Sequence, residues 1–270
     1  MRLEGKAALV TGASRGVGRG VALALGGEGA TVYLTGRTLE AKDRAPGLLD
    51  TAREIEARGG RGVPLEVDHR VDAQVEAAFR RVQAEVGRLD ILVNNAFALP
   101  AGPLFGTPFW EQPIDVWDTM HEVGLRSHYV ASVFAAPLLF RSEGGLVANV
   151  SSFGGASYQV NVAYGVGKAG VDRLAADMAR DLRPRGVTAV SLYPGIVRTE
   201  RVLAGELPFS TEVSESPELT GRAVAAIALD PSRMDLSGQV LVVAELARRY
   251  GFTDVDGSQP PSLARAGRRR

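Results

Sequence analysis

The chain lacks cysteine entirely and has only three histidines among its 270 residues. The absence of cysteine excludes disulfide bonds and thiolate chemistry. Three histidines in unrelated contexts also leave few ligands for a zinc site. Metal sites built from oxygen ligands alone stay open, but no pattern supports one, so we predict that the protein holds no metal.

Long hydrophobic runs are missing as well. The first segment, MRLEGKAALVTGAS (1–14), holds one short apolar run, which is too short for a signal-peptide core and far too short to span a bilayer. No later stretch is both long and free of charge. We therefore expect a cytoplasmic protein without a membrane partner.

Neither sign of charge is in excess. The 31 basic and 31 acidic residues cancel, so the net field gives no reason to expect nucleic acid or an anionic membrane surface as a partner. Any electrostatic effect must be local. The 45% hydrophobic content is sufficient for the core of a folded, soluble protein.

Short β-branched runs alternate along the chain with longer stretches of helical period, which is typical of a parallel sheet with helices on both faces. Expected strands are 7–11, 31–35, 62–67, 91–94, 146–151, 188–193 and 240–243, and expected helices are 16–25, 48–58, 71–86, 117–140, 164–182 and 218–228. This pattern predicts an α/β fold, a Rossmann-type doubly wound domain over residues 1–250 with a seven-stranded parallel sheet.

Two segments fall outside this alternation. Residues 251–270 are read as a C-terminal tail, partly disordered; its end is rich in Gly, Pro, Ser and Arg, which favours a solvated tail over a basic docking peptide. The longest irregular region, 194–217, follows the sixth predicted strand, where open parallel sheets place their ligands. It is a candidate lid, although a plain surface loop fits its composition nearly as well.

The segment TGASRGVGRG (11–20) connects the first predicted strand to the first predicted helix. Gly12, Gly16 and Gly18 permit positive φ angles and let the backbone approach a ligand closely. The free amides and the dipole at the start of the helix favour an anion. In this strand-to-helix context, the turn predicts a seat for a pyrophosphate.

Arginines indicate which dinucleotide the turn would bind. The second predicted strand ends Thr35-Gly36-Arg37, without the carboxylate that would hold a ribose diol. Arg15 lies in the glycine turn, and two guanidinium groups grip a phosphate with forked hydrogen bonds. We therefore predict NADP(H) as the preferred cofactor, with NAD(H) possible. Arg19, one helical turn further on, is read as a solvated residue.

A second constellation carries the acid–base chemistry. Ser152 follows a predicted strand, and the segment YGVGK places Tyr164 and Lys168 four residues apart, on one face of a helix. A phenol with a pKa of about 10 needs a neighbouring cation to work near neutral pH. Lys168 can supply that charge, and Ser152 can donate to a carbonyl where negative charge grows. The pair is common on surfaces, so its place after the serine and the glycine turn matters.

Together, the motifs resemble the short-chain dehydrogenase/reductase family, over about residues 5–245. The matching segments are TGASRGVG, NNA (94–96), NVSS (149–152), YGVGK and YPGIVRT (193–199), in the family's order. Further segments resemble one branch of that family more narrowly, and the last two of them reach beyond the generic fold: RLDILVNNAF, FWEQPIDVWD, HEVGLRSHY, NVAYGVGKAGVDRLAADMARDLR, SLYPGIVRTE and LARRYGFTDVDG.

The resemblance implies a role for each matching residue. Tyr164 would donate the proton in carbonyl reduction, Ser152 would orient the carbonyl, and Lys168 would tune the phenol and bind the nicotinamide ribose. The implied cofactor-binding set is Gly12, Ser14, Arg15, Gly16, Val17, Gly18, Arg37, Asp68, Asn94, Ala96, Tyr164, Lys168, Pro194, Gly195, Ile196 and Thr199. In it, Asp68 would receive the adenine amino group, Asn94 would contact the adenosine side and the sheet, and Thr199 the nicotinamide carboxamide. A helix cap and a strand-end turn former are the alternatives for Asp68 and Asn94.

Two positions depart from the family pattern. Gly124, in HEVGLRS, stands where the family carries an asparagine that supports a proton relay. The relay would then run through His121, His128 or solvent, or activity is modest; a lone helical histidine is more often structural. Phe97 replaces the glycine that commonly follows Asn95-Ala96, which predicts a bulky ring at the substrate mouth. Ser151 is a weaker catalytic candidate than Ser152.

The sequence thus predicts an oxidoreductase that reduces a ketone or aldehyde of a hydrophobic small molecule, or oxidises the alcohol. The expected pocket consists of Phe97, Phe153, Tyr158 and Val160 with the lid near 203–209, and is largely apolar. Broad apolar faces on the helices 117–140 and 164–182 suggest a homodimer or homotetramer. An enoyl reductase or dehydratase on the same fold is one alternative. A cofactor-sensing binding protein with little turnover is the other, and Gly124 keeps it open.

Overall fold

The computed structural model describes residues 1–42, 45–101 and 104–264. Its central sheet has seven parallel strands in the order β3-β2-β1-β4-β5-β6-β9. The strands are β1 (Ala7–Thr11), β2 (Thr31–Gly36), β3 (Arg61–Glu66), β4 (Ile91–Asn94), β5 (Leu146–Val150), β6 (Thr188–Tyr193) and β9 (Val240–Val242). The predicted seven-stranded, doubly wound α/β fold is therefore confirmed, and each strand boundary lies within a residue or so of its predicted position.

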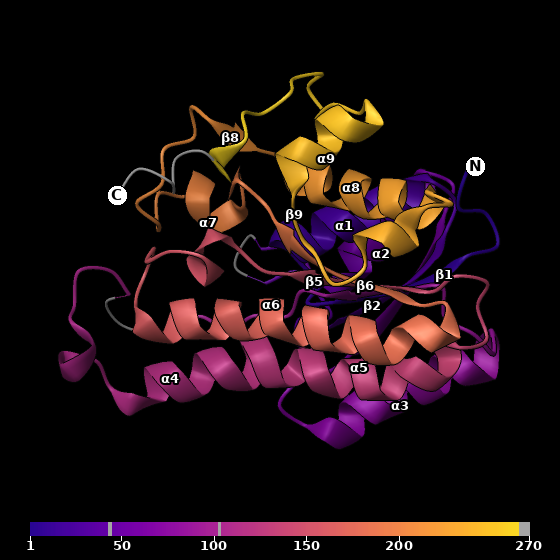
Figure 1. Cartoon of the computed structure of the whole chain (residues 1–270), viewed down its shortest axis with the longest axis horizontal. Coiled ribbons are helices and arrows are strands. Elements are labelled where there is room, and N and C mark those ends of the chain that lie inside the picture. The colour runs from indigo at the N-terminus through magenta and orange to yellow at the C-terminus, as the bar shows by residue number, and fades with distance from the viewer. Residues whose placement is uncertain (43–44, 102–103, 265–270) are drawn as a thin grey trace.

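Helices cover both faces of this sheet (Figure 1). One layer contains α1 (Gly16–Gly27), α2 (Leu48–Ala57), α8 (Pro217–Leu229) and α9 (Val243–Tyr250). The other contains α3 (Asp72–Glu85), α5 (Ser127–Leu139) and α6 (Val162–Leu182). Successive strand side chains alternate between the layers: in β1, Ala8 and Val10 pack in the first core, and Ala7 and Leu9 in the second. Burial on both faces explains the continuous apolar runs of the strands.

The predicted helix 117–140 is interrupted in the structure. It consists of α4 (Ile114–His121), a π-helical turn (Glu122–Arg126) and α5. Such a turn inserts a wider ring of backbone into a helix and is common at functional sites. Gly124 lies buried within it.

The candidate lid, 194–217, contains short regular elements. These are β7 (Ile196–Val197), α7 (Glu200–Leu203) and β8 (Ser214–Glu215), and β7 pairs with β8 in parallel. Helix α9, which the sequence analysis did not predict, follows β9 directly. No helix within the described ranges has the length and apolar character needed to cross a membrane.

Residues 251–264, part of the predicted tail, are hydrogen-bonded to the body of the protein. Asp254 is buried and accepts a hydrogen bond from the Ser216 amide at 2.7 Å. Ser262 donates to Glu245 on α9 at 2.8 Å. The remaining tail, 265–270, lies outside the described residues. The described part of the tail therefore contributes to the surroundings of the lid.

Candidate active site

The turn between β1 and α1 depends on its glycines. Gly12 and Gly16 have φ angles of +68° and +57°, a region that favours glycine. A Cβ on Gly18 would lie 2.2 Å from the Gly12 carbonyl oxygen, and one on Gly12 would lie 3.0 Å from the Ala96 Cα. The turn therefore packs directly against the end of β4. This closeness accounts for the spacing of the three glycines.

Two polar residues that the sequence analysis passed over fix this packing. The Thr11 hydroxyl accepts hydrogen bonds from the backbone amides of Asn95, at 2.8 Å, and Ala96, at 2.9 Å. The Asn95 side chain donates in return to the Thr11 carbonyl at 2.8 Å. Since β1 and β4 are neighbours, these bonds join the carboxyl ends of the two strands. A threonine ending the first strand and a second asparagine after the fourth were the available signals.

An anion already lies at the start of α1. The Glu200 carboxylate, on α7, accepts a hydrogen bond from the Gly16 amide at 3.0 Å. It is the kind of group that the helix dipole and the free amide favour. The turn therefore fits the phosphates of a dinucleotide chemically, with Glu200 as an internal stand-in.

The predicted phosphate-binding arginines are exposed near this turn. Neither Arg15 nor Arg37 pairs with a carboxylate among the described residues. Asp68 is engaged instead with Arg70, whose Nε donates to its Oδ1 at 3.0 Å. That hydrogen bond, with a further contribution from the charge of Arg37, lowers the pKa of Asp68 to about 2. In the part of the chain that the structure describes, no carboxylate therefore pairs with the two cationic groups that were expected to face a 2′-phosphate.

Asn94 joins β4, β5 and α5. Its amide group donates to the Ser132 hydroxyl and to the Asn149 side-chain oxygen, both at 2.9 Å. All three residues are buried. The sheet-stabilising part of the role implied for Asn94 matches this network, whereas its contact with adenosine stays a prediction.

Ser152, Tyr164 and Lys168 come together at the carboxyl end of β5. The Tyr164 hydroxyl donates to the Ser152 Oγ at 2.8 Å, and that Oγ also accepts from the Gly154 amide at 3.1 Å. Lys168 is buried, and its Nζ donates to the Val150 carbonyl at 3.1 Å. The Tyr164 and Ser152 hydroxyl groups are thus in direct contact, and the buried Lys168 lies one helical turn further along α6.

The pKa of the phenol departs from the simplest expectation. Burial raises the pKa of Tyr164, and the hydrogen bond with Ser152 offsets part of that rise. The direction is opposite to the one expected from Lys168 alone. Burial also lowers the pKa of Lys168 to about 8. Both buried groups therefore disfavour their charged forms.

Asn161 positions the backbone of Tyr164. It precedes α6, and its side-chain oxygen accepts a hydrogen bond from the Tyr164 amide at 2.8 Å, as an N-cap does. Its amide group donates to the Leu104 carbonyl at 3.2 Å. The cap thus ties the start of α6 to the segment after β4. An asparagine just before a predicted helix was the signal in the sequence.

An apolar cluster lies beside the phenol. Of the predicted pocket residues, Phe97 and Val160 belong to it, while Phe153 packs on Tyr193 and Tyr158 is 71% exposed. The other members, which the sequence analysis did not identify, are Leu99, Leu104, Phe105, Val116, Met120 and Ala163. Phe209 from the lid packs edge-on against Phe105, with ring centroids 5.9 Å apart. The lid therefore closes over the cluster at 209, whereas Leu203 is exposed.

Other lid residues lie beside the glycine turn. A Cβ on Gly16 would be 3.5 Å from the Thr199 methyl group, so Thr199 is adjacent to the turn. Gly195 packs against the end of the Glu215 side chain, since a Cβ there would be 2.8 Å from the Glu215 Oε2. Thr199 is therefore close to the predicted pyrophosphate seat, and Pro194, Gly195 and Ile196 precede it on the same segment.

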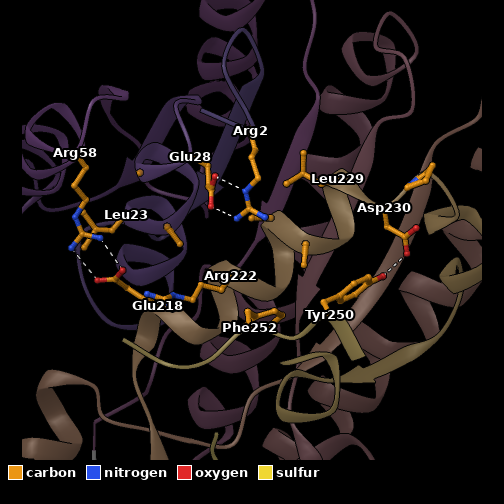
Figure 2. A pocket seen from close by; sticks show the side chains of 15 residues that line it. Arg2, Leu23, Glu28, Arg58, Glu218, Arg222, Leu229, Asp230, Tyr250 and Phe252 are labelled. Carbon is orange, nitrogen blue, oxygen red and sulfur yellow. Dashed lines mark hydrogen bonds and ion pairs between the residues drawn. The ribbon is translucent and has the colours of Figure 1, made fainter. Parts of the chain in front are cut away.

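A separate groove of about 700 Å³ lies between α1, α8 and the segment that contains Tyr250 and Phe252 (Figure 2). Two ion pairs lie in its lining, Arg2 with Glu28 and Arg58 with Glu218 at 2.8 Å. No residue of the predicted site lines it. The chemistry assembled around Tyr164 is therefore independent of this groove.

Known proteins with similar sequences indicate the same family as the motifs do. Residues 6–204 match the short chain dehydrogenase family. The chain belongs to the short-chain dehydrogenase/reductase family. Dehydrogenase/reductase SDR family member 1 of Mus musculus is 46% identical over 271 residues, which cover 94% of this chain and 85% of the relative. The Homo sapiens protein of that name is 45% identical with the same coverage of both. These relatives confirm the branch indicated by the narrower motifs.

Solved structures agree with this assignment. A putative dehydrogenase from Xanthomonas campestris is 28% identical, with a TM-score of 0.83 over 96% of this chain and 94% of that one. A metagenomic short-chain oxidoreductase in complex with NADP is 31% identical, with a TM-score of 0.74 over 90% of this chain and 98% of that one. An oxidoreductase of the short-chain type, with a nicotinamide cofactor, is the function class that the family supports.

Proposed function

We propose that the protein transfers hydride between NADP(H) and a hydrophobic carbonyl compound or its alcohol, with Tyr164, Ser152 and Lys168 as its catalytic residues. The observation that carries this proposal is the Tyr164 hydroxyl, which donates to Ser152 at 2.8 Å next to an apolar cluster. A nicotinamide cofactor, when bound, supplies or accepts the hydride. The apolar side chains favour a hydrophobic substrate over a sugar or an acid.

Each side chain has a defined task. The Tyr164 hydroxyl gives its proton to the oxygen of the carbonyl as negative charge develops there, and takes it back in the alcohol direction. Ser152 donates a hydrogen bond to the same oxygen. Lys168, buried one helical turn from the tyrosine, provides positive charge that favours the phenolate formed in the step.

The preference for NADP(H) rests on charge. Arg15, in the glycine turn, and Arg37, directly after β2, are both exposed. Strand β2 ends without a carboxylate that could hold a ribose diol. A structural neighbour is described in complex with NADP. An Arg37→Ala variant should therefore lose most of its discrimination between NADPH and NADH, whereas Arg53→Ala, an exposed arginine of α2, should keep it.

The function is tested with a panel of ketones and aldehydes, following absorbance of NADPH and NADH. Tyr164→Phe should lower turnover by about a hundredfold or more while NADPH still binds. Tyr158→Phe, which removes an exposed hydroxyl, is the matched control. Cofactor binding without Tyr164-dependent turnover on any carbonyl would favour the cofactor-sensing alternative, and turnover of enoyl substrates alone would favour the enoyl reductase.

We also propose an oligomeric state, from exposed apolar side chains, and keep the cellular location predicted from the sequence. Exposed apolar side chains on α4, α5 and α6, Trp117, Tyr129, Val133 and Val166, favour pairing of subunits as a homodimer or homotetramer. We place the enzyme in the cytoplasm. Light scattering at several concentrations tests the first statement, and cell fractionation tests the second.

A further inference from the structure

Phe97 and Gly124 compete for one small volume. A Cβ on Gly124 would lie 2.5 Å from Cδ2 and 2.7 Å from Cε2 of the Phe97 ring. These distances are far below a van der Waals contact, so the ring can occupy its place only because residue 124 has no side chain. The two departures from the family pattern are therefore a single structural feature.

The ring that fills this volume lies against the catalytic lysine. The Lys168 Nζ is 4.8 Å from the centroid of the Phe97 ring, inside the range of about 6 Å for a cation–π interaction. On its other side, the ammonium donates to the Val150 carbonyl. Phe97 also meets the ring of Tyr164 edge-on, with centroids 5.8 Å apart. One side chain thus contacts both members of the catalytic pair.

Other groups near the ammonium act on it as well: the charge of Asp172 raises the pKa of Lys168, and the centroid of the Tyr164 ring lies 5.8 Å from Nζ. Tyr164 and Asp172 share α6 with Lys168, and Asp172 accepts hydrogen bonds from Ser191 and Tyr193. His128, on α5, is buried, and burial together with the charge of Lys168 lowers its pKa to about 3. It is therefore neutral near pH 7, and cannot act as a protonated relay there.

His128 contributes in another way. Its Nε2 lies 3.2 Å from the carbonyl oxygen of Ala96, which is the residue before Phe97. A neutral imidazole can donate a hydrogen bond to that oxygen. This bond fixes the backbone that aims the ring. Both His128 and Gly124, four residues apart on the π turn and α5, thus serve the placement of Phe97.

We propose that Phe97 is a positioning residue for Lys168: its ring face, admitted by the bare backbone of Gly124, holds the ammonium charge against the Val150 carbonyl beside Tyr164. The role deepens the proposed function and rests on it for its catalytic consequence. Burial disfavours the ammonium, and the charge of Asp172 counteracts part of that effect. In this proposal the negative face of the Phe97 ring, with its centroid 4.8 Å from Nζ, adds to the stabilisation of the charge. Lys168 then keeps its charge at the pH at which the phenol has to give up its proton.

The chain permits a direct measurement of the charge on Lys168, because it has only three lysines, Lys6, Lys42 and Lys168. Lysine isotopically labelled at Cε gives one NMR signal for each, and Lys6→Arg and Lys42→Arg variants assign them. Titration of the full-length protein then yields the pKa of Lys168 without any need for turnover. The variants are Phe97→Leu and, to keep the shape of the ring while weakening its negative face, a polyfluorinated phenylalanine at position 97.

Both changes should lower the pKa of Lys168 by about 0.5–1 pH unit, which is the range of a cation–π contribution. Gly124→Ala should shift it in the same direction by displacing the ring, and should add nothing in a Phe97→Leu background. The matched control is the same pair of changes at Phe105, which belongs to the same apolar cluster and packs on Phe209. In an active enzyme, the alkaline limb of the profile of kcat against pH should move with the pKa.

An unchanged pKa of Lys168 with the polyfluorinated ring would overturn the proposal, even if the enzyme is active. An equal shift from the Phe105 variants would also overturn it, because the effect would then come from the apolar cluster in general. Absence of turnover with every carbonyl, by contrast, would count against the proposed function and leave the titration result standing.

Discussion

The Glu200 carboxylate sits on the Gly16 amide, with Oε2 3.0 Å and Oε1 3.3 Å from the nitrogen, although 184 residues separate the two in sequence. This contact joins the lid helix α7 to the first turn of α1. In the proposed mode of binding, a dinucleotide phosphate takes the same amide, so binding of the cofactor displaces the carboxylate. Glu200 is therefore an internal competitor for the seat.

Replacing Glu200 by Gln should strengthen cofactor binding. The neutral amide satisfies Gly16 less well and no longer repels a phosphate, so the Kd for NADPH should fall by about threefold to tenfold. Titration of the fluorescence of NADPH measures this. Glu206→Gln is the matched control, since Glu206 lies on the same lid and pairs with Arg201. An unchanged Kd in Glu200→Gln would show that the carboxylate leaves the amide without cost.

A buried carboxyl group within the lid predicts how stability depends on pH. Burial raises the pKa of Glu215 from 4.5 to about 7, and the nearby Asp254 adds to the rise. The folded state therefore binds this proton more tightly than the unfolded state. The associated stability is complete below about pH 4.5 and is lost as the pH rises through about 7.

Glu215→Gln should remove this loss. Between about pH 5 and about pH 8, the free energy of unfolding of the wild type should fall by roughly 2–3 kcal/mol relative to the variant. Urea unfolding at both pH values measures the difference. Glu212→Gln, an exposed glutamate of the same segment, should behave as the wild type does. If the free energy of unfolding changed with pH equally in the wild type and in Glu215→Gln, ionisation of Glu215 would cost the folded state no stability.

Much of the frame was predictable because its signals are local. A parallel strand buried on both faces is a short apolar run, and β1, β4 and β6 begin and end where such runs do. The segment YGVGK is a local motif too, since its spacing of one helical turn fixes which residues share a face. At these positions, the local sequence is sufficient to predict the structure.

The remainder depends on contacts between distant segments. The apolar period runs unbroken through 117–140, so the sequence predicts one continuous helix. The π turn lies where Gly124 packs against the ring of Phe97, a residue from the segment after β4. The role of Glu200 depends on its contact with the Gly16 amide, and the raised pKa of Tyr164 follows from burial. Sequence spacing contains neither the distances nor the burial on which these features depend.

The C-terminal segment gives the last prediction, because Asp254 links it to the lid. Its Oδ2 accepts from the Ser216 amide at 2.7 Å and from Arg198 at 3.3 Å, and its Oδ1 accepts from the Val255 amide at 2.8 Å. Arg198 lies in the segment that holds Gly195 and Thr199, next to the glycine turn. The buried carboxylate thus positions the strand and helix that approach the cofactor seat.

Asp254→Asn keeps the shape of the side chain but removes its charge and turns one acceptor into a donor. It leaves Arg198 without its buried partner, so the free energy of unfolding should fall by about 2–4 kcal/mol. The Kd for NADPH should rise as well, because β7 and α7 lose their anchor. Asp256→Asn, an exposed carboxylate 3.5 Å from the same arginine, should change neither quantity appreciably. Urea unfolding and NADPH fluorescence measure the two effects, and a destabilised variant with unaltered NADPH affinity would restrict Asp254 to a purely structural role.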